Sequence, residues 1–129
     1  MRGGGELPMN APFFANWTSQ IRKGLLELML LNDIGNRGMY AYEIEKTLCK
    51  SHSLLMGTAM VYKMLGRFAE QRLVKATERK SPEGPKRKHY ELTPLGRETL
   101  RQMNAYWDTI SGQARAMTGE PSRAQHRQE

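Results

Sequence analysis

The chain has 129 residues, of which 39% are hydrophobic and 26% charged, values that are ordinary for a globular protein. This length suits one domain rather than two. The one cysteine, Cys49, excludes an internal disulfide framework and favours a reducing, cytoplasmic location. No stretch is long or apolar enough to cross a bilayer, so we expect no membrane association.

The positive charge is concentrated in one part of the sequence. The chain carries 20 Lys and Arg against 13 Asp and Glu, a net charge of +7. Residues 63–88 alone contain nine basic and three acidic side chains and therefore carry +6. A localised positive field attracts a polyanion, because each neutralised phosphate releases condensed counterions. The charge favours a nucleic-acid partner, with a solvated charged surface as the alternative.

The first part of the chain predicts a flexible tail followed by a helix. Residues 1–16 contain three consecutive glycines and two prolines, which is typical of a flexible segment. Ser19 to Ile34 predicts a helix that is apolar on more than one side and so faces a core, a dimer interface or both. Residues 35–38 predict a turn. The interface candidates on this helix are Leu25 and Leu28.

Two shorter helices are predicted next, over Tyr40–Lys50 and Thr58–Arg72. The later one has Val61, Leu65 and Phe68 on an inner stripe and basic residues on the opposite face. This order is typical of a helix-turn-helix, whose second helix enters the DNA major groove. A lysine or arginine there reaches guanine acceptors, and a hydroxyl reaches phosphate. The groove-facing candidates are Thr58, Tyr62, Lys63 and Arg67, and the alternative is a solvated face with Tyr62 packed against the preceding helix.

A β-hairpin is predicted over Leu73–Arg79 and Lys88–Thr93, joined by a loop rich in turn residues and cations. A hairpin in this place is the wing of a winged helix-turn-helix. Lys86, Arg87 and Lys88 are the candidate phosphate or minor-groove contacts, with a charged surface hairpin as the alternative.

The last predicted helix begins with Thr93-Pro94, an N-cap followed by proline at the first helical position, and extends to Gly112. Residues 113–129 are polar and are predicted to be flexible. The apolar stripe of this helix has no partner within the winged helix-turn-helix, so we predict a homodimer. The stripe's interface candidates are Met103, Tyr106, Trp107 and Ile110.

The predicted fold is therefore mainly α with a small β-hairpin wing. It comprises a DNA-binding domain over residues 17–93 and a dimerisation helix over residues 94–112.

Four segments resemble the PadR family of bacterial regulators, in its short subfamily with a single C-terminal helix. They are IRKGLLELMLL, GMYAYEI, VYKMLGRFAEQRLV and EGPKRKHYELTPLGRETL, and together they cover about residues 20–110. The chain departs from the family pattern at three positions. Lys63 stands where proline is usual, and Ala41 and Arg72 stand where glycine is common. Lys63 bears on base specificity, because it lies where the helix enters the groove.

The resemblance implies a sequence-specific repressor that acts as a homodimer on an inverted repeat in double-stranded DNA. In the family pattern, Tyr40 and Tyr42 pack in the protein or contact the DNA backbone. In some short members a tryptophan on the final helix lines a pore at the dimer interface and stacks on flat aromatic ligands. Trp107 falls at the matching position, which implies a planar aromatic effector. The alternative is that Trp107 only packs the interface.

Residues suited to catalysis or metal binding are scattered. His52, His89 and His126 lie far apart in the sequence, and no Cys/His pair has metal-ligand spacing. We therefore predict no catalytic residues, no metal site and no cofactor, and do not expect an enzyme. Two alternatives to a specific regulator stay open: a winged-helix protein-interaction module, which should lack the +6 segment, and a nonspecific nucleic-acid binder.

Overall fold

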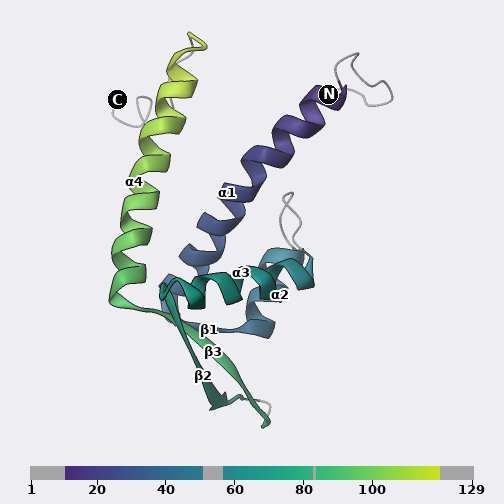
Figure 1. The fold of residues 1–129 in the computed structure, drawn as a ribbon, viewed down its shortest axis with the longest axis vertical. Helices are drawn as coiled ribbons and strands as arrows, with labels where there is room; N and C mark the ends of the chain where they lie inside the picture. Colours follow the sequence, from purple (N-terminus) through teal and green to yellow (C-terminus); the bar gives the residue numbers. More distant parts are fainter. Residues whose placement is uncertain (1–10, 51–56, 83, 120–129) are drawn as a thin grey trace.

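The computed structural model describes residues 11–50, 57–82 and 84–119. Figure 1 shows two long helices that extend from a small helical and β region, with a hairpin projecting from the other side of that region. The predicted class, mainly α with a β-hairpin wing, is confirmed. His52, His126 and the predicted tails before residue 11 and after residue 119 lie outside this description. The elements in chain order are α1 (Ala11–Arg37), β1 (Met39–Tyr40), α2 (Ala41–Lys50), α3 (Thr58–Glu70), β2 (Val74–Lys80), β3 (Lys86–Leu92) and α4 (Pro94–Ala116).

The core lies where α1, α2, α3 and the sheet meet. The predicted inner stripe of α3 is confirmed, because Val61, Leu65 and Phe68 are all buried. Each large apolar side chain removed from water contributes roughly 1.5–3 kcal/mol, so this cluster orients α3 firmly. The most completely buried large side chains are Leu30, Leu31, Ile34, Met39, Ile44, Val61 and Leu65.

The sheet is antiparallel with the strand order β1-β3-β2. The hairpin pairs β2 with β3 from Val74 opposite Leu92 to Lys80 opposite Lys86. The short strand β1 pairs with β3 and places Met39 opposite Tyr90. Strand β1 was not predicted, because two residues are too few to form a periodic pattern.

Both long helices extend beyond their predicted ends. Helix α1 begins at Ala11, so residues 11–16 are helical although they were predicted as flexible tail. It also continues through residues 35–37, where a turn was predicted, and the chain reverses at Gly38 with φ of +72°. Helix α4 continues past Gly112 to Ala116. The signal for the early start is present in the sequence, because Phe14, Trp17 and Ile21 continue the apolar stripe of α1.

A glycine at the start of α4 allows this helix to pack directly on the end of β2. The Thr93 hydroxyl oxygen accepts a hydrogen bond from the Gly96 N–H at 2.9 Å, which confirms the predicted N-cap. A Cβ at Gly96 would lie 2.0 Å from the carbonyl oxygen of Leu73. Only glycine allows the helix to approach that backbone so closely.

Arg72 and Ala41 occupy positions where the resembling family commonly has glycine. Arg72 has φ of +63°, in the left-handed region that glycine adopts without steric cost. The structure therefore explains the usual glycine there, and the arginine retains this conformation at a cost of about 1 kcal/mol. Ala41 is a buried residue in the first turn of α2, where a small side chain fits.

Candidate nucleic-acid interface

The outer face of α3 is exposed and carries two of the predicted groove-facing residues. Tyr62 is 46% exposed, and Lys63 beside it is exposed as well. Thr58 is the first residue of the helix and follows Gly57, which supplies no side-chain cap. Because the buried stripe holds the opposite face, this surface points away from the protein.

Tyr62 is held by the neighbouring helix α2. Its hydroxyl donates a hydrogen bond to the Glu45 carboxylate, and this bond, together with partial burial, raises the pKa of Tyr62. Tyr62 thus packs beside α2, as the alternative interpretation proposed, while nearly half of it stays accessible.

The fourth groove-facing candidate, Arg67, makes an ion pair with α1. Its Nη1 lies 2.7 Å from Glu27 Oε2. This contact ties α3 to α1 and balances the charge of the arginine. The two cations therefore differ. Arg67 is paired with Glu27, whereas we find no acidic partner for Lys63 within the described residues.

The tip of the wing brings like charges together. Lys86, Arg87 and Lys88 are all exposed on β3. Across the hairpin, Lys80 is opposite Lys86 and Arg79 is opposite Arg87. Like charges directly opposite one another destabilise a hairpin. An anionic partner at the tip relieves this repulsion, so the arrangement suits a surface that contacts phosphate.

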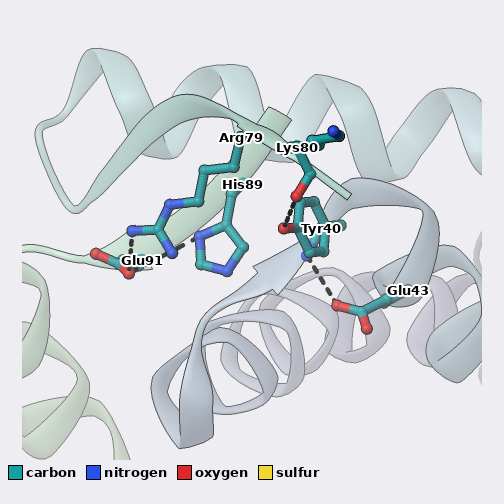
Figure 2. A network of polar contacts seen from close by, with 6 residues as sticks. All are labelled: Tyr40, Glu43, Arg79, Lys80, His89 and Glu91. Atoms are coloured by element: carbon teal, nitrogen blue, oxygen red, sulfur yellow. Dashed lines mark hydrogen bonds and ion pairs between the residues drawn. The ribbon is translucent and has the colours of Figure 1, made fainter. Parts of the chain in front are cut away.

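Figure 2 shows the polar network on the outer face of the wing. The hydroxyl of Tyr40 donates a hydrogen bond to the Lys80 carbonyl oxygen at 3.1 Å, and its backbone N–H donates to Glu43 Oε1 at 3.0 Å. Arg79 Nη2 lies 2.8 Å from Glu91 Oε2. These contacts link β1, the start of α2 and both strands of the hairpin.

His89 is buried inside this network. The edge of its ring packs against Tyr40, with the ring centroids 4.8 Å apart. Its Nδ1 lies 3.8 Å from Glu91 Oε2, too far for a hydrogen bond, and has no other hydrogen-bond partner among the described residues. Burial, followed by the nearby charge of Arg79, lowers the pKa of His89. The neutral imidazole therefore fits this site better than the cation.

At the other end of the molecule, an apolar cleft of about 970 Å³ separates the outer halves of α1 and α4. Tyr106 is 68% exposed and Trp107 is 36% exposed. Trp17 and Ile21, which the sequence did not single out as interface residues, also line the cleft. The structure brings together here all six residues predicted for the dimer interface: Leu25, Leu28, Met103, Tyr106, Trp107 and Ile110.

Polar side chains fix the two helices to each other nearer the sheet. Asn32 on α1 and Asn104 on α4 exchange two amide hydrogen bonds, at 3.1 and 3.0 Å. A partly buried, reciprocally hydrogen-bonded pair of this kind sets the register between two helices.

Two classes of feature are missing from the described residues. No group of three or more His, Cys, Asp or Glu side chains that could hold a metal ion is found there. No helix in the same ranges is long and apolar enough to cross a membrane. Cys49 lies in α2, but its side chain is outside the description.

Comparison with known proteins gives this arrangement a family. The sequence model of the transcriptional regulator PadR-like family matches residues 30–102, more than half of the chain. The chain belongs to the PadR-like family. PadR-like proteins are DNA-binding transcriptional regulators, not enzymes, so the partner that the charge favoured is the partner of the family.

Solved structures of PadR-like proteins have the same fold. The PadR-like transcriptional regulator from Bacillus cereus is 29% identical, with a TM-score of 0.72 over 79% of this chain and 99% of that one. A Streptococcus transcriptional regulator is 28% identical, with a TM-score of 0.71 over 77% of this chain and 97% of that one. An uncharacterised protein of Lysinibacillus sphaericus is 28% identical over 71% of this chain and 86% of its own length.

The PadR fold also places residues that the sequence had not selected. Lys46 on α2 lies near the wing, and Glu45 holds Tyr62. The signal for Lys46 was available, because helical spacing puts it one turn after Tyr42. Glu45 and Tyr62 lie on different helices, so spacing along the chain does not connect them. The place of Trp17 could not be predicted from the sequence, because it depends on how α1 and α4 diverge.

Proposed function

We propose that this PadR-like protein is a sequence-specific transcriptional repressor that binds an inverted repeat in double-stranded DNA as a cytoplasmic homodimer. Residues 17–93 form the DNA-reading unit, and α4 assembles the dimer. The observation that carries the proposal is the exposed face of α3 beside a wing whose tip has cations on both strands.

In this proposal α3 enters the major groove. Tyr62 and Lys63 face the DNA, and a lysine at this place reaches guanine acceptors. Thr58 begins the helix, and its side chain lies outside the described residues. Arg67 joins them only after leaving Glu27, so its contribution is smaller. The wing residues Lys86, Arg87 and Lys88 bind phosphates or the adjacent minor groove, which fixes the register of the helix on the duplex.

The dimer is proposed from the apolar cleft. Large aromatic side chains at both of its walls stay exposed in one chain, including Trp17 and Tyr106. Exposed apolar area of this extent marks a protein interface, and a second copy covers it on both protomers at once. A two-fold dimer then places the two α3 helices about one DNA turn, ~10 bp, apart.

Electrostatics supports the duplex as partner and gives a quantitative test. A dimer carries twice +7, that is +14. If it neutralises roughly six to ten phosphates, affinity falls by about three to five decades between ~50 and ~200 mM salt.

The test of the proposed function is selection from a random duplex library with the purified protein at ~150 mM salt, where nonspecific binding is suppressed. Enrichment of an inverted repeat is the expected result. Binding without any enriched sequence would instead favour a nonspecific nucleic-acid binder. No binding by a folded dimer at any salt concentration would favour a protein-interaction module.

A second candidate function, release by a small planar aromatic effector, is favoured by two indoles in one cleft. Trp17 and Trp107 both line it, and their π faces suit stacking on a flat or cationic ring. Release also requires that the effector bind two dimer shapes with different affinity. In calorimetry, Trp107→Ala should abolish binding of a flat aromatic dye while the dimer persists, and Trp107→Phe should retain part of it. Unchanged dye binding in Trp107→Ala contradicts the stacking role.

A further inference from the structure

The ring of Tyr42 contacts cations from two different elements. The guanidinium carbon of Arg87 on β3 lies 5.2 Å from the ring centroid. The Nζ atom of Lys46, one turn further along α2, lies 5.7 Å from the same centroid. Both distances are within the range of a cation–π interaction. One half-buried ring therefore brings together a cation of the helix-turn-helix and a cation of the wing.

The ring is itself held in place. Tyr42 packs on Tyr40, with the centroids 5.7 Å apart and the planes at 40°. Tyr40 is fixed on three sides, by the Lys80 carbonyl, the Glu43 carboxylate and the edge of His89 (Figure 2). Through Tyr40, the Tyr42 ring is therefore anchored to both strands of the hairpin and to α2, and its position does not depend on a bound partner.

The chemistry of this cluster suits a phosphate. A guanidinium that lies over an aromatic ring keeps its N–H edges at the periphery, where an anion can accept from them. The contact also restricts a long side chain before binding, which reduces the entropy lost when a ligand is held. Lys46 and Arg87 carry like charges beside the same ring, so an anion that contacts both is attracted by each of them.

Other arginines near the proposed DNA surface are already neutralised. Arg79 is paired with Glu91 at 2.8 Å, and Arg67 with Glu27 at 2.7 Å. For Arg87 and Lys46 the partner found among the described residues is the neutral ring of Tyr42, not a carboxylate. Their charge is therefore available to an anion.

We propose that Lys46 and Arg87, positioned by the Tyr42 ring, form a single binding site for one DNA backbone phosphate where α2 meets the wing. Tyr42 acts as a positioning residue and does not itself contact DNA. This inference rests on the proposed DNA binding, but it concerns a sequence-independent contact, so it does not require that an operator exist.

The experiment measures the affinity of the full-length protein for a mixed-sequence duplex at ~50 mM salt, and again across a salt series. Arg87→Ala and Lys46→Ala should each weaken binding and reduce the salt slope by about one. Tyr42→Leu should weaken binding about two- to fivefold, whereas Tyr42→Phe should stay within about twofold of wild type, because the π face is retained. Urea unfolding verifies that each variant is folded.

A double-mutant cycle separates positioning from general structure. In an Arg87→Ala, Lys46→Ala background, Tyr42→Leu should have no further effect on affinity. Lys88→Ala is the matched control: it removes a neighbouring exposed cation for which no contact with Tyr42 is found, so its effect should add fully to that of Tyr42→Leu.

The outcomes distinguish the two proposals. Full additivity between the affinity losses of Tyr42→Leu and the two cation variants overturns the inference. A Tyr42→Phe protein that binds DNA as weakly as Tyr42→Leu also overturns it, because that result assigns the contact to the hydroxyl. Absence of any duplex binding by the wild-type protein overturns the proposed function and, with it, this inference. Retained duplex binding without an enriched operator removes sequence specificity and leaves the phosphate site supported.

Discussion

The wing end and the cleft end of this molecule differ in how well contacts within a single chain cover and hold their side chains. At the wing, cations and aromatic rings are held by contacts within the chain, such as Tyr40 to Lys80 and Arg87 on Tyr42. At the cleft, Tyr106 and Trp107 line a large apolar space with few neighbours to cover them. The difference is that the wing end presents exposed charge, which suits an anionic partner, whereas the cleft end leaves apolar side chains exposed, as the interface of the proposed dimer would.

The two ends join at the start of α4, where a substitution should damage both. A Cβ at Gly96 would lie 2.0 Å from the backbone oxygen of Leu73, which cannot move without displacing β2. We expect Gly96→Val to lower the free energy of unfolding by more than about 3 kcal/mol, measured by urea denaturation.

The control is Gly66→Ala on α3, because no atom lies within 4 Å of the added Cβ. Alanine in a helix should raise stability there by about 0.5–1 kcal/mol. A Gly96→Val protein as stable as wild type would mean that α4 does not pack against β2 as described.

One charge placed in the cleft should disrupt the cleft end, where we propose the dimer interface, without disturbing the fold of the wing end. Ile110→Glu places a carboxylate in the apolar cleft, so the proposed dimer should dissociate while the monomer stays folded. Loss of bivalency should then weaken operator binding by about 10²- to 10⁴-fold. Sedimentation gives the assembly state, and titration of the operator duplex gives the affinity.

Thr109→Glu adds the same charge one residue earlier, at an exposed position that does not line the cleft. It should remain dimeric. If both variants dissociate, the charge itself is responsible and the cleft is not the interface.

On α3, the difference between Lys63 and the ion-paired Arg67 predicts a smaller effect, on DNA affinity. Lys63→Ala should weaken specific binding by about 1–2 kcal/mol, because it removes a base or phosphate contact. Arg67→Ala should cost about 0.5 kcal/mol or less in binding, since Arg67 is engaged with Glu27. Both should leave the dimer intact. Equal losses in affinity would show that the ion pair opens on DNA.

Acidification should affect the wing end first. The pKa of His89 is lowered from its usual 6.5 by burial and then by Arg79, with Glu91 and Glu43 opposing this shift. The unfolded chain therefore binds the proton more tightly than the folded chain. Stability is at its full value above pH 6.5 and falls as the pH decreases through 6.5 toward the folded-state pKa.

The check is urea unfolding of His89→Gln between pH 7.5 and 5. The variant should be less stable at neutral pH but should lose less stability on acidification than wild type. His126→Gln removes an imidazole elsewhere and serves as the control. An unchanged pH slope in His89→Gln would assign the acid sensitivity to other groups.

Local patterns were enough to predict most of the secondary structure. The inner stripe of α3 and the cap at Thr93 both depend on neighbours within a turn or two, and both were predicted correctly. The ends of α1 were predicted wrongly, because glycine and proline near these positions favour a break in the helix, whereas the apolar stripe that Phe14 and Trp17 continue toward the N-terminus favours the longer helix that forms. The two-residue β1 gains its conformation from β3, fifty residues away in sequence, and no local signal marks it.

By itself, the sequence determined a mainly helical winged domain, a concentrated basic segment and an apolar final helix, because periodicity and charge are properties of neighbouring residues. Only the tertiary structure decided which of those residues act together. It paired Arg67 with Glu27, placed Arg87 of the wing on the Tyr42 ring of α2, and set Trp17 in the same cleft as Trp107. Each of these contacts joins residues of different elements, so it depends on the packing of helices and strands and not on spacing along the chain.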